Sequence, residues 1–420
     1  MSHFIIRGGK TLSGEIPVRG AKNHATKMFP AALLCKEPVV LTHMPVIEDV
    51  ARMRDLLSSV GYQTVDTASR SIRIIPTTRS LATELPRSIA ERIRPSILFA
   101  GPLLAREGRA QFPHPGGCVI GRRPIDVFLE GWRAMGAVIR ENSAGFDIRA
   151  RELRGTDYTF RLVSHTGTEG LMMTAVLAKG RTILRNAALE PEIAALAKFL
   201  NACGARIQGA GTPIISIEGT GGKLLKGGTC QIIPDRLEAG SFAILAALLG
   251  KDLKITQCDP AHMEVLLAYL RSAGAGIEQG KDWLSITRAA KLQPVNVRTH
   301  EYPGFATDYQ APFMVLLTQA HGESMVFETL FEGRLAYVED LNRMGAHIVP
   351  CDLHRAIVFG PAKLRPRNFE SPDLRAGMAF VIAALVARGT SRVSNVYQID
   401  RGYEKLDERL QAVGADIKRE

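Results

Sequence analysis

The segment Arg133-Ala134-Met135-Gly136-Ala137-Val138-Ile139 joins an apolar helical pattern to a short run of β-type residues. A glycine at this junction is typical of a helix that ends in a left-handed residue. The arrangement recurs at intervals of 68 to 75 residues along the chain, at Gly61, Gly136, Gly204, Gly274, Gly345 and Gly414. The 420 residues therefore contain six copies of one unit of about 70 residues.

Each copy contains two helices of different kinds. The helix before the glycine is amphipathic, with Met263, Leu266 and Leu270 on one stripe in the fourth copy. An earlier helix, as in residues 170–178 and 377–385, is apolar nearly all round, so we expect it to be buried on every side. The unit reads strand, buried helix, strand, amphipathic helix, strand.

The length and a glycine-rich stretch at residues 219–228 point to two similar domains with three copies each. We expect an α/β fold in which the buried helices lie inside a shell of short sheets and outer helices.

Polar and charged residues lie at the N-terminal ends of the apolar helices. Charges in a core are costly unless they are paired or face water, and a bound anion would relieve the cationic ones. We predict that they meet in a phosphate-binding cleft between the domains, with helix caps and surface ion pairs as the alternative. These residues are Lys22, Asn23, Arg92, Arg94, Thr168, Glu169, Asp235, Arg236, Glu238, Thr307, Asp308, Asp373 and Arg375.

The composition limits the class of protein. A net charge of +11 suggests an anionic partner without saying which. The chain has no apolar signal core and no apolar run of the roughly 18 residues that a membrane span needs, so we expect a soluble cytoplasmic protein. Six cysteines without a close pair indicate free thiols. Ten scattered histidines give no zinc spacing, so we expect no metal site.

One cysteine lies in an unusual loop, residues 113–126. Cys118 follows two glycines, which favour mobility, and precedes Arg122 and Arg123, which favour the thiolate. We interpret Cys118 as an acid, base or nucleophile on a lid. An inert loop cysteine is the alternative.

Several long motifs in fixed order resemble the UDP-N-acetylglucosamine 1-carboxyvinyltransferases, the enolpyruvyl transferases that open peptidoglycan synthesis. The resemblance covers essentially the full length. The motifs are Gly20–Asn23, Pro115–Cys118, Ile120–Pro124, Asn186–Ala188, Glu190–Glu192, Ile233–Arg236, Phe305–Gln310, Asp373–Arg375 and Ile399–Glu404.

The resemblance implies a fold of two inverted α/β barrels, or α/β prisms, each made of three βαβαββ repeats. It places the first domain at residues 22–233, with the Cys118 loop. The second domain takes residues 1–21 and 234–420, because the first strand crosses over, and the active site lies in the cleft between the domains.

The implied reaction moves the enolpyruvyl group of phosphoenolpyruvate to the 3′-hydroxyl of UDP-N-acetylglucosamine and releases phosphate. Asp308 would take the proton of the hydroxyl, for which we expect a raised pKa. Cys118 would protonate the methylene carbon and could hold phosphoenolpyruvate covalently.

The resemblance also implies which residues bind the substrates. The implied reaction needs no metal or cofactor. Lys22, Arg123 and Arg401, assisted by Arg375, would bind the phosphate and the carboxylate. The nucleotide sugar would be held by Asn23, Arg94, Arg123, Pro124, Ile125, Asp126, Val127, Ser164, Asp308 and Leu330. The oligomeric state stays open.

Two segments depart from the family pattern. Residues 24–27, His-Ala-Thr-Lys, replace small residues followed by Leu-Pro, and the proline is Pro30, so we expect the first helix to start differently. At position 162, where family members typically carry a lysine on the uridine side, this chain has leucine, two positions before Ser164. Because of these departures, a catalytically lapsed paralogue is one alternative.

Two other functions compete with this prediction. An enolpyruvyl transferase that acts on 3-phosphoshikimate shares the fold but does not need the loop cysteine. A DNA sliding clamp also has six α/β repeats, but its inner helices should carry Lys and Arg toward the DNA. Helices that are apolar all round, and 6% aromatic residues without basic interleaving, argue against a nucleic-acid partner.

Overall fold

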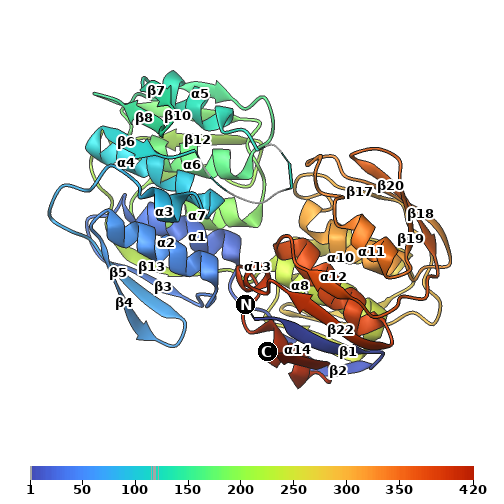
Figure 1. Ribbon diagram of the computed structural model, residues 1–420. Coiled ribbons are helices and arrows are strands. Elements are labelled where there is room, and N and C mark those ends of the chain that lie inside the picture. Colours follow the sequence, from blue (N-terminus) through green and yellow to red (C-terminus); the bar gives the residue numbers. More distant parts are fainter. Residues whose placement is uncertain (1, 115, 117–119, 122) are drawn as a thin grey trace. The chain divides into compact units, whose positions relative to one another are not determined.

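The computed structural model describes residues 2–114, 116, 120–121 and 123–420. The described chain divides into two compact units (Figure 1). The middle unit comprises residues 20–114, 116 and 123–233. The terminal unit comprises residues 2–19, 120–121 and 234–420.

Three sheets form the strand layer of the middle unit. The first has the order β13-β3-β5-β4, and the second the order β9-β10-β12-β11. The third is three-stranded, with the order β6-β8-β7. The strands are β3 (Val39–Thr42), β4 (Gln63–Ala68), β5 (Ser71–Ile75), β6 (Arg109–Phe112), β7 (Val138–Asn142), β8 (Gly145–Arg149), β9 (Asp157–Thr159), β10 (Arg181–Arg185), β11 (Arg206–Gln208), β12 (Ile214–Glu218) and β13 (Gly228–Gln231).

The terminal unit has three four-stranded sheets, β21-β22-β1-β23, β2-β14-β16-β15 and β17-β18-β20-β19. Strands β1 and β2 from the start of the chain therefore complete two sheets with residues of the C-terminal half. The strands are β1 (Phe4–Gly8), β2 (Leu12–Pro17), β14 (Gly250–Thr256), β15 (Gly276–Gln279), β16 (Trp283–Thr287), β17 (Val297–Arg298), β18 (Gly322–Phe327), β19 (His347–Pro350), β20 (Arg355–Gly360), β21 (Asn368–Glu370), β22 (Gly389–Ser394) and β23 (Asp416–Arg419).

The sheets share one pairing pattern. In each four-stranded sheet one edge strand pairs in parallel and the remaining pairs are antiparallel. In the three-stranded sheet the parallel edge is reduced to a bridge between Glu84 and Gln111. There Leu85 N donates to Gln111 O at 2.9 Å, and Gln111 N donates to Thr83 O at 2.7 Å.

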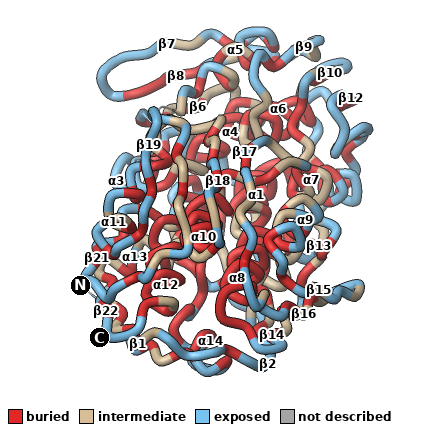
Figure 2. The backbone as a smooth tube through the Cα atoms, turned by 90° about the vertical axis from the view of Figure 1, so that its right-hand side faces the viewer, coloured by how far each residue is buried: buried red, intermediate tan, exposed pale blue. Residues whose placement is uncertain are grey.

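Apolar helices fill the interior of each unit, as the sequence predicts. Every residue of α8 is buried, and α6, α10 and α12 are buried over nearly their whole lengths (Figure 2). The inner helices are α1 (Lys22–Ala32), α4 (Ala100–Glu107), which continues η1 (Arg94–Phe99), α6 (His165–Leu177), α8 (Arg236–Leu249), α10 (Thr307–Leu317) and α12 (Leu374–Val386). Their burial removes apolar surface from water and provides the main stabilisation of both cores.

Amphipathic helices bury one face and expose the other. In α9, Leu266, Leu267 and Leu270 are buried while its polar residues face water. The outer and short helices are α2 (Glu48–Ser59), α3 (Arg87–Ala90), α5 (Asp126–Ala134), α7 (Pro191–Ala202), η2 (Pro260–Met263), α9 (Glu264–Ser272), α11 (Val338–Arg343), α13 (Tyr397–Asp400) and α14 (Leu406–Ala412).

The six repeat glycines all adopt positive φ, between 96° and 108°. The prediction of left-handed residues after the outer helices is confirmed. A side chain at these positions would be strained, and glycine avoids that strain. Among the described residues, no helix combines the length and apolar character that crossing a membrane requires.

Candidate active site

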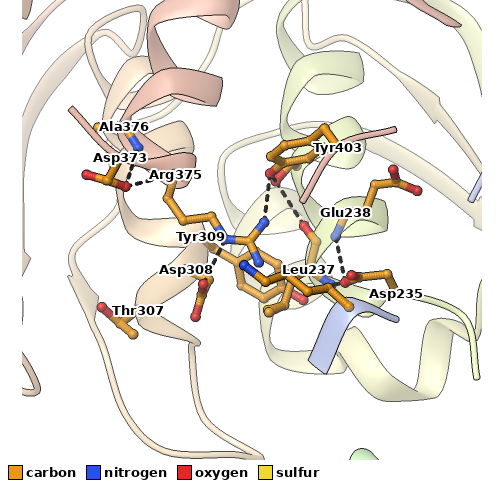
Figure 3. A network of polar contacts seen from close by, with 12 residues as sticks. Asp235, Leu237, Glu238, Thr307, Asp308, Tyr309, Asp373, Arg375, Ala376 and Tyr403 are labelled. Carbon is orange, nitrogen blue, oxygen red and sulfur yellow. Dashed lines mark hydrogen bonds and ion pairs between the residues drawn. The ribbon is translucent and has the colours of Figure 1, made fainter. Parts of the chain in front are cut away.

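Asp308 and Arg375 form the centre of a polar network in the terminal unit (Figure 3). Asp308 lies in the first turn of α10 and Arg375 in the first turn of α12. Arg375 Nε donates to Asp308 Oδ1 at 2.7 Å, and Arg375 Nη1 donates to the hydroxyl of Tyr403 at 2.9 Å. That hydroxyl lies 2.7 Å from Ser241 Oγ of α8, so the network connects the three inner helices of this unit.

Two carboxylates cap the helices that carry this network. Asp373 Oδ1 accepts hydrogen bonds from the backbone N–H groups of Arg375 and Ala376 at the start of α12. Asp235 Oδ1 accepts from two N–H groups at the start of α8 in the same way. For these two residues the alternative reading as helix caps is correct, because their oxygens satisfy amides that have no partner within the helix.

The charge state of Asp308 differs from the sequence prediction. Burial alone would raise its pKa, but Arg375 and Arg334 favour the carboxylate, and the pKa of Asp308 is held well below its usual range. The predicted raised pKa is therefore wrong. The side chain, 32% exposed, is an ionised hydrogen-bond acceptor at neutral pH.

Arg334 is a residue of this site that the sequence reasoning missed. Its side chain is 6% exposed, and Nη2 lies 3.8 Å from Asp308 Oδ1. Nη2 also donates to the carbonyl of Thr307 at 3.3 Å. No motif in the sequence singles this arginine out, although it follows Leu330 by four positions.

A buried carboxylate orders the segment around Leu330. Glu328 Oε1 accepts from the backbone N–H of Leu330 at 3.0 Å and from that of Phe331 at 3.3 Å. Glu328 Oε2 accepts from Thr307 Oγ1 at 2.8 Å, which fixes Leu330 relative to the start of α10.

Arg401 directly follows α13, and its Nη1 donates to Gln398 Oε1 at 3.1 Å.

Lys22 and Asn23 open the first inner helix of the middle unit. Helix α1 begins at Lys22, and Pro30 lies inside it near its end. Lys22 Nζ lies 2.7 Å from Asp49 Oδ2 of α2. The carbonyl of Asn23 accepts from Lys27 Nζ at 2.9 Å.

Arg94 meets the predicted substrate-binding segment 123–127. Its guanidinium donates to the backbone carbonyl of Arg123 and, at 3.4 Å, to that of Pro124. Burial and the neighbouring charge of Arg123 lower the pKa of Arg94 to about 10. Helix α5 begins at Asp126, and Ile125 directly precedes it. The carbonyl of Val127 accepts from the hydroxyl of Tyr158 at 3.3 Å.

The other predicted residues have different surroundings. Ser164 caps α6, because its Oγ accepts from Gly167 N at 3.1 Å. Leu162, where family members carry lysine, is 72% exposed. Cys118 and Arg122 lie outside the described residues. In the part of the chain that the structure describes, no three His, Cys, Asp or Glu side chains are grouped so as to hold a metal ion.

Comparisons with known proteins identify the family. Residues 6–410 match the family described as EPSP synthase (3-phosphoshikimate 1-carboxyvinyltransferase). Over 421 residues the chain is 44% identical to the UDP-N-acetylglucosamine 1-carboxyvinyltransferase of Solibacter usitatus, and the match covers 100% of both chains. The chain belongs to this enolpyruvyl transferase family.

A second relative supports this family assignment, and solved structures share the fold. The UDP-N-acetylglucosamine 1-carboxyvinyltransferase of Acidobacterium capsulatum is 44% identical, with 100% of this chain and 96% of the relative covered. The enolpyruvyl transferase NikO from Streptomyces tendae superposes with a TM-score of 0.90 at 23% identity, covering 100% of this chain and 98% of its own. EPSP synthase from Acinetobacter baumannii gives a TM-score of 0.74 at 18% identity, with both chains fully covered.

The enolpyruvyl transferase structures share the mixed α/β fold of this chain. The sliding-clamp alternative is not favoured.

Proposed function

We propose that this chain transfers the enolpyruvyl group of phosphoenolpyruvate to the 3′-hydroxyl of UDP-N-acetylglucosamine, with release of phosphate. The proposal is supported by full-length relatives named for this reaction and by an ionised Asp308 at the mouth of α10. The reaction would be the first committed step of peptidoglycan synthesis, and we propose that it takes place in the cytoplasm.

Asp308 acts as the base in this proposal. Its carboxylate accepts the proton of the sugar hydroxyl while the hydroxyl oxygen forms a bond to C2 of phosphoenolpyruvate. The Cys118 thiol gives its proton to C3, which produces a tetrahedral adduct. The bond from C2 to the phosphate oxygen then breaks, and phosphate leaves with the proton that Asp308 had accepted. C3 returns a proton to the Cys118 thiolate, so that the vinyl group is restored.

Cations replace a metal ion in this scheme. Lys22, Arg123, Arg375 and Arg401 bind the phosphate and carboxylate of phosphoenolpyruvate and stabilise the charge of the adduct. No cofactor takes part. The nucleotide sugar is bound by Asn23, Arg94, Pro124, Ile125, Asp126, Val127, Ser164 and Leu330.

We also propose that each unit is an inverted α/β barrel with its inner helices as the core. Three sheets and three inner helical segments in each unit support this description. The predicted domain limits, 22–233 for one domain and 1–21 with 234–420 for the other, and the cleft between them stay predictions.

Release of inorganic phosphate from phosphoenolpyruvate tests the function. We expect release that depends on UDP-N-acetylglucosamine and that falls sharply in Cys118→Ser. Cys351→Ser is the matched control, because Cys351 is an exposed free cysteine. Phosphate release with 3-phosphoshikimate instead would assign the chain to the enolpyruvyl transferases that act on 3-phosphoshikimate. No phosphate release with either acceptor would contradict the proposal.

A further inference from the structure

Lys27 belongs to the segment in which this chain departs from its family's pattern, and it is buried, with 2% of its surface exposed. Side chains on a helix lean toward its N-terminus. Accordingly, Lys27 Nζ reaches back one turn and donates to the carbonyl of Asn23 at 2.9 Å. The ammonium therefore lies beside the turn that carries Lys22 and Asn23.

An ammonium group at this place needs a partner. The start of a helix repels positive charge, and a buried unpaired cation is costly. Glu169 of α6, fully buried, provides that partner: its Oε2 lies 3.1 Å from Lys27 Nζ. The pair thus connects the first turn of α1 to α6, across 142 positions of sequence.

The chain of charges continues beyond Glu169. His165 Nε2 lies 3.2 Å from Glu169 Oε1, and His165 Nδ1 lies 3.9 Å from Glu190 Oε1 at the start of α7. Burial opposes protonation of His165, but the two glutamates outweigh it and raise its pKa. Alternating charges therefore connect the N-terminal ends of α1, α6 and α7.

The first turn of α1 lacks the usual means of stabilisation. The residue before it, Ala21, makes no side-chain cap, and the turn has no acidic residue. Lys22 contacts Asp49 in this turn, and Lys27 adds a hydrogen bond to the carbonyl of Asn23 and an ion pair with Glu169. Substrate binding by Lys22 and Asn23 depends on the orientation of this turn.

We propose that Lys27 and Glu169 are positioning residues, which fix the first turn of α1 on α6 so that Lys22 and Asn23 meet the anionic substrates in the correct geometry. The inference rests on the proposed function. It adds two buried residues to the binding machinery that do not touch substrate themselves.

Steady-state kinetics of Lys27→Met provide the test. We expect KM for phosphoenolpyruvate and for UDP-N-acetylglucosamine to rise roughly tenfold, the lower end of what loss of a hydrogen bond to a charged group produces, while kcat changes much less. Glu169→Gln, which keeps an acceptor but loses the charge, should act in the same direction. It serves as the second variant if Lys27→Met does not fold.

A control and a double variant separate positioning from stability. Thr174→Val removes a buried hydroxyl nearer the C-terminal end of α6. This hydroxyl accepts a hydrogen bond from Trp132 Nε1 and donates one to the carbonyl of Gly170. The substitution should lower the melting temperature without raising KM. Lys27→Met combined with Glu169→Gln should regain stability, since no lone buried charge is left, but KM should stay high.

Hydrogen exchange gives a readout that does not depend on catalysis. The amides of residues 23–27 should exchange faster in Lys27→Met than in the wild type. In Thr174→Val these amides should exchange at the wild-type rate. A KM that is no higher than that of Thr174→Val, or unchanged exchange, would overturn the proposal. An inactive wild type with faster exchange in Lys27→Met would instead reject the proposed function and leave the structural role of Lys27 supported.

Discussion

His24 should make the middle unit lose stability in acid. This histidine is fully buried in α1, and its Nδ1 accepts a hydrogen bond from the backbone N–H of Ile233 at 3.3 Å. Burial lowers the pKa of His24 to about 4, against attraction from Glu192 and Glu169. The folded unit therefore holds His24 neutral at a pH where the unfolded chain protonates it.

The size of the effect follows from the two pKa values. The unfolded histidine titrates near 6.5 and the folded one near 4. The contribution of His24 to stability is complete above pH 6.5 and is lost as the pH falls toward 4, because the unfolded state then binds more protons. Between pH 7.5 and pH 5 the loss is about 2 kcal/mol, from 1.36 kcal/mol per pKa unit.

His24→Asn removes the titration and keeps an acceptor near the position of Nδ1. The free energy of unfolding of the middle unit can be measured by urea denaturation in a Trp283→Phe background, where the buried Trp132 is the remaining tryptophan. We expect the difference between wild type and variant to change by about 2 kcal/mol between pH 7.5 and pH 5 in favour of the variant.

Two results would decide against this reasoning. A difference between wild type and His24→Asn that stays constant over the pH range means that His24 does not resist protonation in the folded unit. A similar change for His321→Asn, an exposed histidine of the terminal unit, would show that the pH dependence is not specific to the buried site.

Three further predictions concern the terminal unit and the repeats. Arg375→Met should raise the pKa of Asp308, so the acidic limb of kcat/KM against pH should move to higher pH; an unmoved limb would separate this arginine from the base. Arg409→Leu removes the ion pair of the buried Glu238, in which Arg409 Nη2 lies 3.0 Å from Glu238 Oε2. The free energy of unfolding of the unit, measured by urea denaturation, should fall by about 3–5 kcal/mol, and the additional change Glu238→Leu should largely restore it. Gly136→Ala places a side chain at φ 97° and should cost about 1 kcal/mol or more, whereas a neutral result would show that the turn adapts.

Much of the fold could be predicted because its signals are local. A helix that ends in a left-handed glycine, as at Gly136, and a helix that is apolar all round, as in α12, are properties of a few consecutive residues. These signals recur six times and identify the repeats and the buried helices. The long motifs around Asp308 and Arg375 likewise placed two charged residues in one site before any distance was known.

The pairing between strands that are distant in the sequence could not be predicted from such local patterns. The pairing of β2 with β14, and the return of β13 to β3, depend on which edges remain open after the rest of the unit has folded. The reduced edge at Glu84 also carries no local signal, because a single parallel bridge needs no alternating pattern.

By itself the sequence determined the six repeats, the buried and outer helices and the residue types of the site. The tertiary structure alone decided which charges meet. Asp308 and Arg375 are 67 positions apart, and their contact at 2.7 Å turns an expected raised pKa into a lowered one. Lys27 forms an ion pair with Glu169, which belongs to another repeat. Electrostatic energies depend on distance and burial in space, and neither quantity is encoded in a local stretch of residues.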